Sequence, residues 1–246
     1  MTTLQDKGTQ KSTKRPAGRS RIGQLAGAPD VASSMKIHNG FVGGGYSFMF
    51  GRNLEEKKSF IAKIAGEIFF DKGFKESSLH DISIKGNISK AGIYHYFKAK
   101  EDILSYILFQ NTEYGIQALE DSLKKSEGQH LPPQESLREL LKTYAAALLK
   151  NRKNSLLVLR ERHQLSGKSR QTLQDKERAL FQLLKNQLRT ASNINRAIDV
   201  NLVSFHILSS IHWMGYWFDE KGSISKAEAI DQTITIIFNG ILNKKT

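Results

Sequence analysis

Cysteine is absent from the 246-residue chain, which excludes a disulfide framework and any metal site built on thiolates. This absence also favours a reducing compartment, so we expect a cytoplasmic protein. Long apolar runs are missing too. The most apolar stretch, residues 207–218, is interrupted by Ser, His and Gly and falls short of the roughly 18 apolar residues of a membrane span. Residues 1–52 contain no apolar core of a secretory signal.

Strand-like alternation of polar and apolar residues is also absent, and proline is rare, with four residues in the whole chain. Pro132 and Pro133 are adjacent and mark a break between helical segments. The pattern on both sides of this break is helical. We therefore expect an all-α protein.

Acidic residues are outnumbered, since 24 Asp and Glu stand against 37 Lys and Arg, for a formal net charge of +13. Such an excess favours a polyanionic partner such as DNA. It is uneven: residues 1–52 carry eight Lys or Arg against two acids, and residues 53–101 carry nine Lys against seven acids. The composition is therefore compatible with DNA binding, but specific evidence for it has to come from a sequence motif.

Residues 79–100 have the pattern of two short helices joined by a tight turn. Ser78 and Asp81 stand at the two positions of a capping box for the first helix. Gly86 and Asn87 follow, and these residue types readily take the left-handed conformation that ends a helix. Two short helices around such a turn are the plan of a DNA-reading helix-turn-helix.

The second of these helices, residues 90–97, is short and polar, and Ser89 stands at its expected N-cap. Only Ile93 and Phe97 are spaced to dock inward. Small residues on the outer arc allow close approach to a groove floor, while lysine, histidine and tyrosine suit phosphate oxygens and base edges. The outer arc consists of Lys90, Ala91, Gly92, His95 and Tyr96.

Residues 60–104 resemble, without a gap, the DNA-binding half of TetR-family transcriptional regulators. The positions that carry the resemblance are Lys72-Gly73-Phe74, Ser77-Ser78, Asp81-Ile82, Ile88-Ser89-Lys90, Tyr94, Phe97 and Lys100-Glu101. The resemblance implies a homodimer on double-stranded operator DNA. It adds Ser77, Ser78, Ser89, Tyr94 and Lys100 to the expected DNA contacts.

Lys100 is the residue that the resemblance places at a helix start, where it binds a phosphate with the help of the helix dipole. A solvated surface lysine is the alternative for this position. Three departures from the family pattern, Gly86, Asn87 and Gly92, leave the binding mode unchanged. Gly92 removes a side chain that could touch DNA, so the operator sequence stays open.

Three regions are expected along the chain. Residues 1–52 hold nine of the 19 glycines and the basic run 11–21, and indicate a disordered basic arm that contacts DNA, or else a leader before a later start at Met35 or Met49. Residues 53–101 form the helix-turn-helix domain. Residues 102–246 form a helical ligand-binding and dimerisation domain.

Apolar residues recur at helical spacing from residue 54 onward, and we expect about nine helices. Besides the two short ones, they cover residues 54–72, 100–128, 133–150, 154–165, 168–190, 194–219 and 225–243. Three core-facing stripes stand out: Phe60, Ile61, Ile64, Ile68 and Phe69; Leu137, Leu140, Leu141, Tyr144 and Leu148; and Leu173, Leu180, Leu184 and Leu188.

The helix over residues 225–243 carries a wide apolar stripe that includes Ile234 and Ile237, and the helix over residues 194–219 leaves almost no polar face, through residues such as Phe205 and Trp213. A helix of that kind needs burial on two sides, so we expect these helices of two subunits to form a dimeric four-helix bundle.

The segment from residue 159 to residue 170, together with residues 212–225, also resembles TetR regulators that sense acyl-CoA thioesters. In those regulators an apolar tunnel holds the acyl chain and basic residues face the nucleotide phosphates. The resemblance makes Arg160, Arg162, His163 and Arg170 the phosphate-side candidates, and Tyr144, Phe205, Trp213 and Trp217 the tunnel candidates. The alternatives are a solvated basic edge and ordinary core packing.

We therefore predict a transcriptional repressor that a small hydrophobic effector, such as an acyl-CoA, releases from DNA. The competing interpretations are an architectural or partner-recruiting DNA-binding protein without an effector and an enzyme whose helix-turn-helix is incidental. His206 and His212 are roughly 240° apart around a helix and cannot chelate one metal ion from one face. No catalytic signature is present, and we expect neither an enzyme nor a cofactor.

Overall fold

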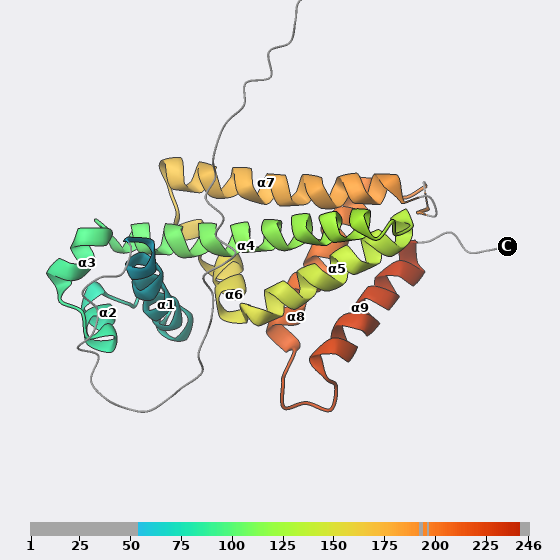
Figure 1. Cartoon of the computed structure of the whole chain (residues 1–246). Helices are drawn as coiled ribbons and strands as arrows, with labels where there is room; N and C mark the ends of the chain where they lie inside the picture. The colour runs from blue at the N-terminus through green and yellow to red at the C-terminus, as the bar shows by residue number, and fades with distance from the viewer. Residues whose placement is uncertain (1–53, 192–193, 196, 242–246) are drawn as a thin grey trace, which may run out of the picture. The chain divides into compact units, whose positions relative to one another are not determined.

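The computed structural model describes residues 54–191, 194–195 and 197–241 (Figure 1). The arm or leader predicted for residues 1–52 lies outside this part of the chain. The described residues form nine α-helices and one short 3-10 helix. Their bounds are α1 Leu54–Lys72, α2 Leu79–Gly86, α3 Lys90–Tyr96, α4 Lys100–Gly128, α5 Pro133–Lys150, α6 Arg152–Glu161, η1 Arg162–Gln164, α7 Gly167–Thr190, α8 Val200–Trp217 and α9 Lys226–Ile241.

Helices α1 to α3 form a small N-terminal head around one apolar core. The apolar stripe predicted on α1 supplies Ile61, Ile68 and Phe69, all buried. Gly73 ends α1 at a φ of +90°, a conformation that favours glycine, and so turns the chain back. Phe74 then meets the ring of Phe69 edge-on, with the centroids 5.2 Å apart, and closes the head.

Helix α4 connects the head to the C-terminal half, and α7 lies alongside it (Figure 1). The first turns of α4 bury Ile103, Leu104 and Ile107 in the head core. Leu119, farther along the same helix, belongs to the C-terminal core. One continuous helix therefore takes part in both cores.

Helix α6 also joins the two halves, because it packs on α1 as well as on α4 and α8. Leu157 and Val158 of α6 are buried in the head core. The helices approach closely at Gly66 of α1, where a Cβ atom would lie 2.9 Å from the side-chain oxygen of Asn154. The head is thus held against α6 as well as attached through α4.

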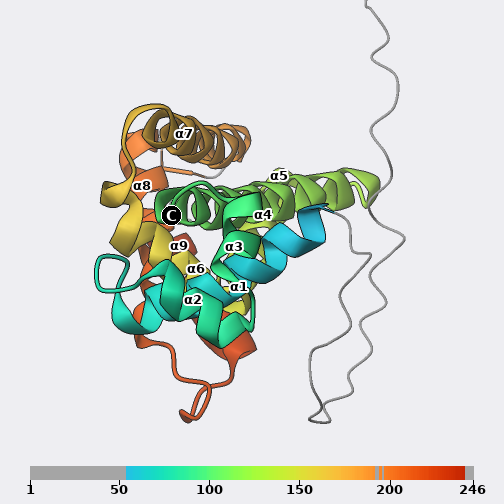
Figure 2. The ribbon, with the colours of Figure 1, turned by 90° about the vertical axis from the view of Figure 1, so that its left-hand side faces the viewer.

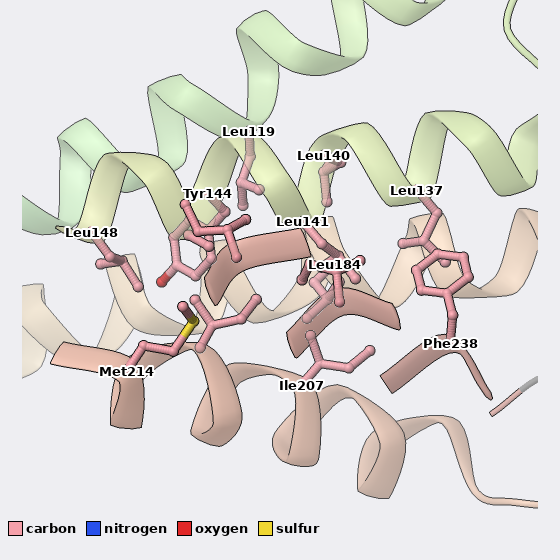
Figure 3. Close-up of a cluster of buried hydrophobic side chains, with 14 of the residues drawn as sticks. Leu119, Leu137, Leu140, Leu141, Tyr144, Leu148, Leu184, Ile207, Met214 and Phe238 are labelled. Carbon is pink, nitrogen blue, oxygen red and sulfur yellow. The ribbon is translucent and has the colours of Figure 1, made fainter. Parts of the chain in front are cut away.

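The C-terminal core lies among α4, α5, α7, α8 and α9 (Figure 3). Tyr144 and Leu148 of α5 face Met214 of α8, while Phe238 of α9 packs beside Leu137. The leucine stripes predicted for α5 and α7 are confirmed, since the following members are all buried: Leu137, Leu140, Leu141, Leu148, Leu173, Leu180, Leu184 and Leu188.

Two predicted helix boundaries were wrong. The helix expected over residues 154–165 ends at Glu161 and continues as η1, after which extended backbone lets Leu165 pack into the head core. The helix expected from residue 194 begins at Val200, because the Asp199 side chain accepts hydrogen bonds from the backbone N–H groups of Asn201 and Leu202. Within the described residues, no helix is long and apolar enough to cross a membrane.

Candidate nucleic-acid interface and effector cavity

The predicted capping box at the start of α2 is confirmed. The Ser78 hydroxyl oxygen accepts from the Asp81 backbone N–H at 3.2 Å, and the Asp81 carboxylate accepts from the Ser78 backbone N–H at 2.8 Å. Lys72 donates to the same carboxylate at 2.7 Å. These contacts, led by Lys72 and followed by Ser78, hold the pKa of Asp81 well below its usual range.

The turn after α2 is formed by Asn87, which lies in the left-handed region at φ 47° and ψ 46°. This conformation lets the Ile88 backbone N–H donate to the Ser83 carbonyl at 3.1 Å, and the Ser83 hydroxyl donates back to the Ile88 carbonyl at 2.7 Å. Ser89 then caps α3 by accepting from the Gly92 N–H at 3.0 Å. The angle between α2 and α3 is therefore set by local hydrogen bonds.

Helix α3 presents a polar outer face, and Figure 2 shows the head turned toward the viewer. Ile93 and Phe97 are buried in the head core, as predicted from their spacing. Tyr96 is half-buried against that core, and its ring meets the His95 ring edge-on at 4.8 Å. The exposed residues of the face are Ser89, Lys90, Ala91, Tyr94 and His95, with Gly92 partly exposed.

Two of the expected DNA contacts have partners within the head. Ser77 is buried and its hydroxyl donates to the Phe74 carbonyl at 2.7 Å. The Lys100 ammonium donates to the carbonyls of Phe74 and Ser77, both at 2.6 Å, and to that of Lys75 at 3.3 Å. It also lies 4.3 Å from the centre of the Phe74 ring.

A lysine ammonium has three N–H donors, and these three carbonyls match that number. A phosphate would therefore have to compete with contacts that Lys100 already makes inside the head. The phosphate role stays a prediction, and the part-buried contacts of Lys100 differ from those of a solvated surface lysine. Lys100 ties the first turn of α4 to the connection between α1 and α2.

A cavity of about 660 Å³ opens in the C-terminal half, among α4, α5, α6, η1, α7 and α8. Its walls combine apolar side chains with a small set of polar ones, the usual character of a small-molecule site. The lining residues are Asn111, Thr112, Gly115, Tyr144, Leu148, Ser155, Val158, Leu159, Arg162, Gln174, Glu177, Arg178, Leu180, Phe181, Phe205, Leu208, Ser209 and His212.

The polar pair in this cavity is formed by Tyr144 and His212, with the phenol oxygen 3.3 Å from the imidazole Nε2. His212 Nδ1 lies 2.7 Å from the Leu208 carbonyl oxygen. Burial lowers the pKa of His212, against a smaller opposing effect of the Leu208 hydrogen bond, so the imidazole is neutral at pH 7. Burial, and to a lesser extent the charge of Glu177, raises the pKa of Tyr144, which stays a phenol.

An ion pair crosses the cavity wall between η1 and α7, where Arg162 donates to Glu177 at 2.7 Å. Burial raises the pKa of Glu177, and Arg162 opposes that effect. The neighbouring Arg178 is paired with Asp175 at 2.8 Å. Among the described residues, no group of three or more His, Asp or Glu side chains could hold a metal ion.

Two family models match the chain. The model for bacterial regulatory proteins of the tetR family matches residues 61–107, and the model for the tetracyclin repressor-like C-terminal domain matches residues 130–241. The first range covers the helix-turn-helix and the second covers most of the cavity-forming helices. The chain belongs to the TetR family of bacterial transcriptional regulators.

Three known proteins are similar to this chain over most of its length. HbdR, an HTH-type transcriptional regulator of Aromatoleum sp. strain CIB, is 23% identical over 78% of this chain and 83% of its own. PfmR from Thermus thermophilus is 26% identical, covers 74% of this chain and 99% of its own, and has a TM-score of 0.66. AibR, solved with isovaleryl coenzyme A and operator DNA, is 24% identical over 74% of this chain and 98% of its own, with a TM-score of 0.62.

The ligand candidates of this TetR-family chain are only partly brought together. Tyr144, Arg162 and Phe205 line the cavity, and the Phe205 ring lies 4.6 Å from that of Phe181. The predicted tunnel residues Trp213 and Trp217 are 61% and 50% exposed and lie outside the cavity lining.

The remaining basic candidates, too, lie outside the cavity lining. Arg160 donates to the Phe70 carbonyl at 3.3 Å and lies over the Phe70 ring, so it contacts α1 of the head. His163 and Arg170 are exposed on the surface. These three candidates therefore lie apart from the cavity in this structure.

Sequence reasoning missed the polar lining residues Gln174, Glu177 and His212, and the aromatic Phe181. A signal for three of them existed, since Gln174, Glu177 and Phe181 share one face of α7 at spacings of three and four. For His212, the six-residue spacing from His206 excludes joint metal binding from one helix face but gives no sign of a place in the cavity. Its partner Tyr144 is 68 residues away, so no local pattern could have revealed the pair.

Proposed function

We propose that this TetR-family regulator is a homodimeric repressor that leaves its operator when a hydrophobic effector enters the 660 Å³ cavity. The observation that carries the proposal is the position of α4. Asn111, Thr112 and Gly115 of this helix line the cavity, while Lys100 at its start is bonded into the head. An effector that displaces α4 would therefore move the head directly.

The dimer is proposed to form through α8 and α9, in the four-helix bundle predicted from their apolar faces. Leu202 of α8 and Ile236 of α9 are 53% and 72% exposed, and both line an apolar groove between these helices. In an isologous dimer, this face of one subunit would be buried against the same face of the other. It would also present two α3 helices at a separation of about 34–36 Å, as successive major grooves require.

DNA contact is proposed for the exposed face of α3 and the turn before it. Lys90 and His95 are assigned to base edges, and Tyr94 to the phosphate backbone. The remaining assignments are Ser78, Ser89, Ala91, Gly92 and Tyr96, of which Tyr96 contributes through its half-buried ring edge.

The effector class is proposed to be an acyl thioester or a similar amphipathic molecule with an apolar body. AibR, which shares the fold, was solved with isovaleryl coenzyme A. The cavity has apolar walls from Leu148, Val158 and Leu180, with Arg162 at its edge. A cavity of this volume also favours an effector-controlled regulator over an architectural protein with a closed core.

The effector acts only through its differential affinity for the two states of the dimer. Reversing a 1:99 population ratio to 99:1 needs about 5.5 kcal/mol. Burial of roughly 200 Å² of apolar ligand surface at ~25 cal/mol per Å² supplies a comparable amount if it occurs only in the released state.

A gel-shift experiment tests this function. The operator is first selected from random-sequence DNA with the purified full-length protein, and acyl-CoAs of increasing chain length are then titrated into the complex. Release of DNA by acyl-CoAs, with coenzyme A alone inactive, is the expected result. Operator binding that no member of the series weakens would contradict the effector mechanism, and tighter binding would favour activation.

A further inference from the structure

A second cleft, of about 580 Å³, lies between α1 of the head, α4 and the junction of α5 with α6. We call it the junction cleft. It shares one lining residue, Asn111, with the 660 Å³ cavity, and the function proposed above does not use it. Apart from Ala62 and Ile107, every residue that lines it has a polar side chain. Its volume is in the usual range of small-molecule sites, and its lining favours a polar ligand.

Positive charge predominates in the junction cleft. The single acidic lining residue is Glu67, and Lys85, which lies outside the cleft, already pairs with it at 2.8 Å. Against this one acid stand four cationic residues of the lining: Lys63, Lys150, Arg152 and Lys153. The first turn of α6, which begins at Arg152, adds no acid and no side-chain cap, so the positive end of this helix is uncompensated as well. The cleft therefore favours an anion.

Two of these cations lack a counter-charge. The side chains of Lys63 and Lys150 are exposed and have neither an ion-pair nor a hydrogen-bond partner within the described residues. Arg152 donates through Nε to the Gly215 carbonyl at 2.6 Å, which anchors its guanidinium group to the end of α8. Arg152 is thus held in place, and the two lysines remain available to a ligand.

The 660 Å³ cavity differs in this respect. Its two arginines, Arg162 and Arg178, each pair with a carboxylate. Of the four cations in the junction cleft, only Lys153 pairs with a carboxylate in the described part of the chain, and its distance from Asp71 is 3.6 Å. The positive charge of the junction cleft is therefore largely left for a ligand to neutralise.

We infer that the junction cleft binds a nucleotide polyphosphate. A single anion at exposed lysines gains little, because water and salt screen the attraction. A chain of phosphates, in contrast, can contact Lys63, Lys150 and Arg152 together. Lys63 belongs to α1 and Lys150 to α5, so the bound ligand would connect the head to the C-terminal half.

The base of the nucleotide is assigned to Tyr114. This residue of α4 lines the cleft, is 38% exposed, and has no ring contact with another aromatic side chain among the described residues. A nucleobase can stack on the free face of such a ring. The amide groups of Gln110 and Asn111 in the same lining supply hydrogen-bond donors and acceptors for the base or ribose. Nucleotide binding here does not depend on the effector proposed for the 660 Å³ cavity.

Calorimetric titration of the full-length protein with ATP, tripolyphosphate and adenosine tests this assignment. ATP is expected to bind more tightly than tripolyphosphate, and adenosine too weakly to detect. Lys63→Gln and Lys150→Gln should each weaken ATP binding about fivefold, since each removes one charge contact to phosphate. Lys124→Gln is the matched control and should leave ATP binding unchanged, because Lys124 is an exposed lysine of α4 outside the cleft lining.

Tyr114→Leu separates the base from the phosphates. It should weaken ATP binding about tenfold and leave tripolyphosphate binding unchanged, which also shows that the variant is folded. Coenzyme A contains the same nucleoside and a diphosphate, so its competition with ATP distinguishes two sources of the ligand. Displacement of ATP would include the nucleotide end of coenzyme A among the ligands, and no displacement would restrict the cleft to free nucleotides.

Three results would overturn the assignment. These are the absence of ATP binding, an equal loss of affinity in Lys124→Gln and Lys150→Gln, and ATP binding that Tyr114→Leu leaves unchanged. None of them bears on the effector mechanism, which the gel-shift experiment tests.

Discussion

Single residues decide how the head is held together, and Lys100 illustrates this. Its ammonium group satisfies carbonyls of Phe74, Lys75 and Ser77, more than twenty residues earlier in the chain. These carbonyls belong to the connection that leads into α2. Lys100 therefore ties the helix-turn-helix to the start of α4.

Lys100→Met is expected to lower the free energy of unfolding by about 1–3 kcal/mol, because partly buried carbonyls lose their donors. It should weaken binding to all DNA sequences while leaving the salt dependence unchanged. Chemical denaturation and a gel-shift salt titration measure the two effects. Lys98→Met is the matched control, since Lys98 is exposed and close in sequence.

The contrary outcome for Lys100→Met is equally specific. Loss of one phosphate contact would flatten the slope of log affinity against log salt by about one unit. If that flattening occurred with unchanged stability, Lys100 would bind phosphate in the complex and its assignment as a structural tie within the head would be wrong.

A second prediction at the residue scale concerns Asp81 and the pH dependence of stability. Its folded-state pKa lies below the ordinary value of 3.8 because Lys72 and Ser78 bond to the carboxylate. An ionised carboxylate with a lowered pKa stabilises the folded state at pH values above the unfolded-state pKa. This stabilisation is lost as the pH falls from the unfolded-state pKa toward the folded-state pKa. The difference in melting temperature between the natural protein and Asp81→Asn should be present at pH 7 and shrink below about pH 4, and a constant difference would contradict the account.

At the scale of elements, some helix ends are decided by capping residues nearby in the sequence, and others by tertiary packing. The caps of α2 and α3 need only residues within the same turn, and both were predicted. The end of α6 depends instead on where Leu165 packs, and its predicted position was wrong. Helix starts were predicted where the cap was recognised, at Ser78 and Ser89, and the start of α8 was missed although Asp199 caps it.

The cap at Ser78 can be tested by itself. Ser78→Ala removes the acceptor for the Asp81 backbone N–H and should cost about 1 kcal/mol of stability. Ser78→Gly should cost only a few tenths of a kcal/mol, because glycine leaves the backbone groups open to water. Thermal denaturation of both variants measures the effect, and equal losses would argue against a capping role.

For the whole molecule, the exposed apolar face of α8 and α9 determines the assembly that we propose. Leu202→Glu and Ile236→Glu place charges on that face and should yield a monomer in sedimentation experiments. Operator affinity should fall together with dimerisation, because one α3 helix contacts a single half-site. Ile84→Glu, at a similarly exposed isoleucine of α2, should remain dimeric. A dimer that persists in both α8 and α9 variants would place the interface elsewhere.

The sequence by itself determined the all-α class, the helix-turn-helix, its caps and the core-facing stripes of α1, α5 and α7. These features depend on residues within one or two helical turns of each other, so local spacing reveals them. Only the tertiary structure decided which side chains meet in the cavity and where Lys100 donates. The partners Tyr144 and His212 are 68 residues apart, and Lys100 and Phe74 are 26 apart. Contacts over such separations depend on how the helices pack, which no periodicity in the chain encodes.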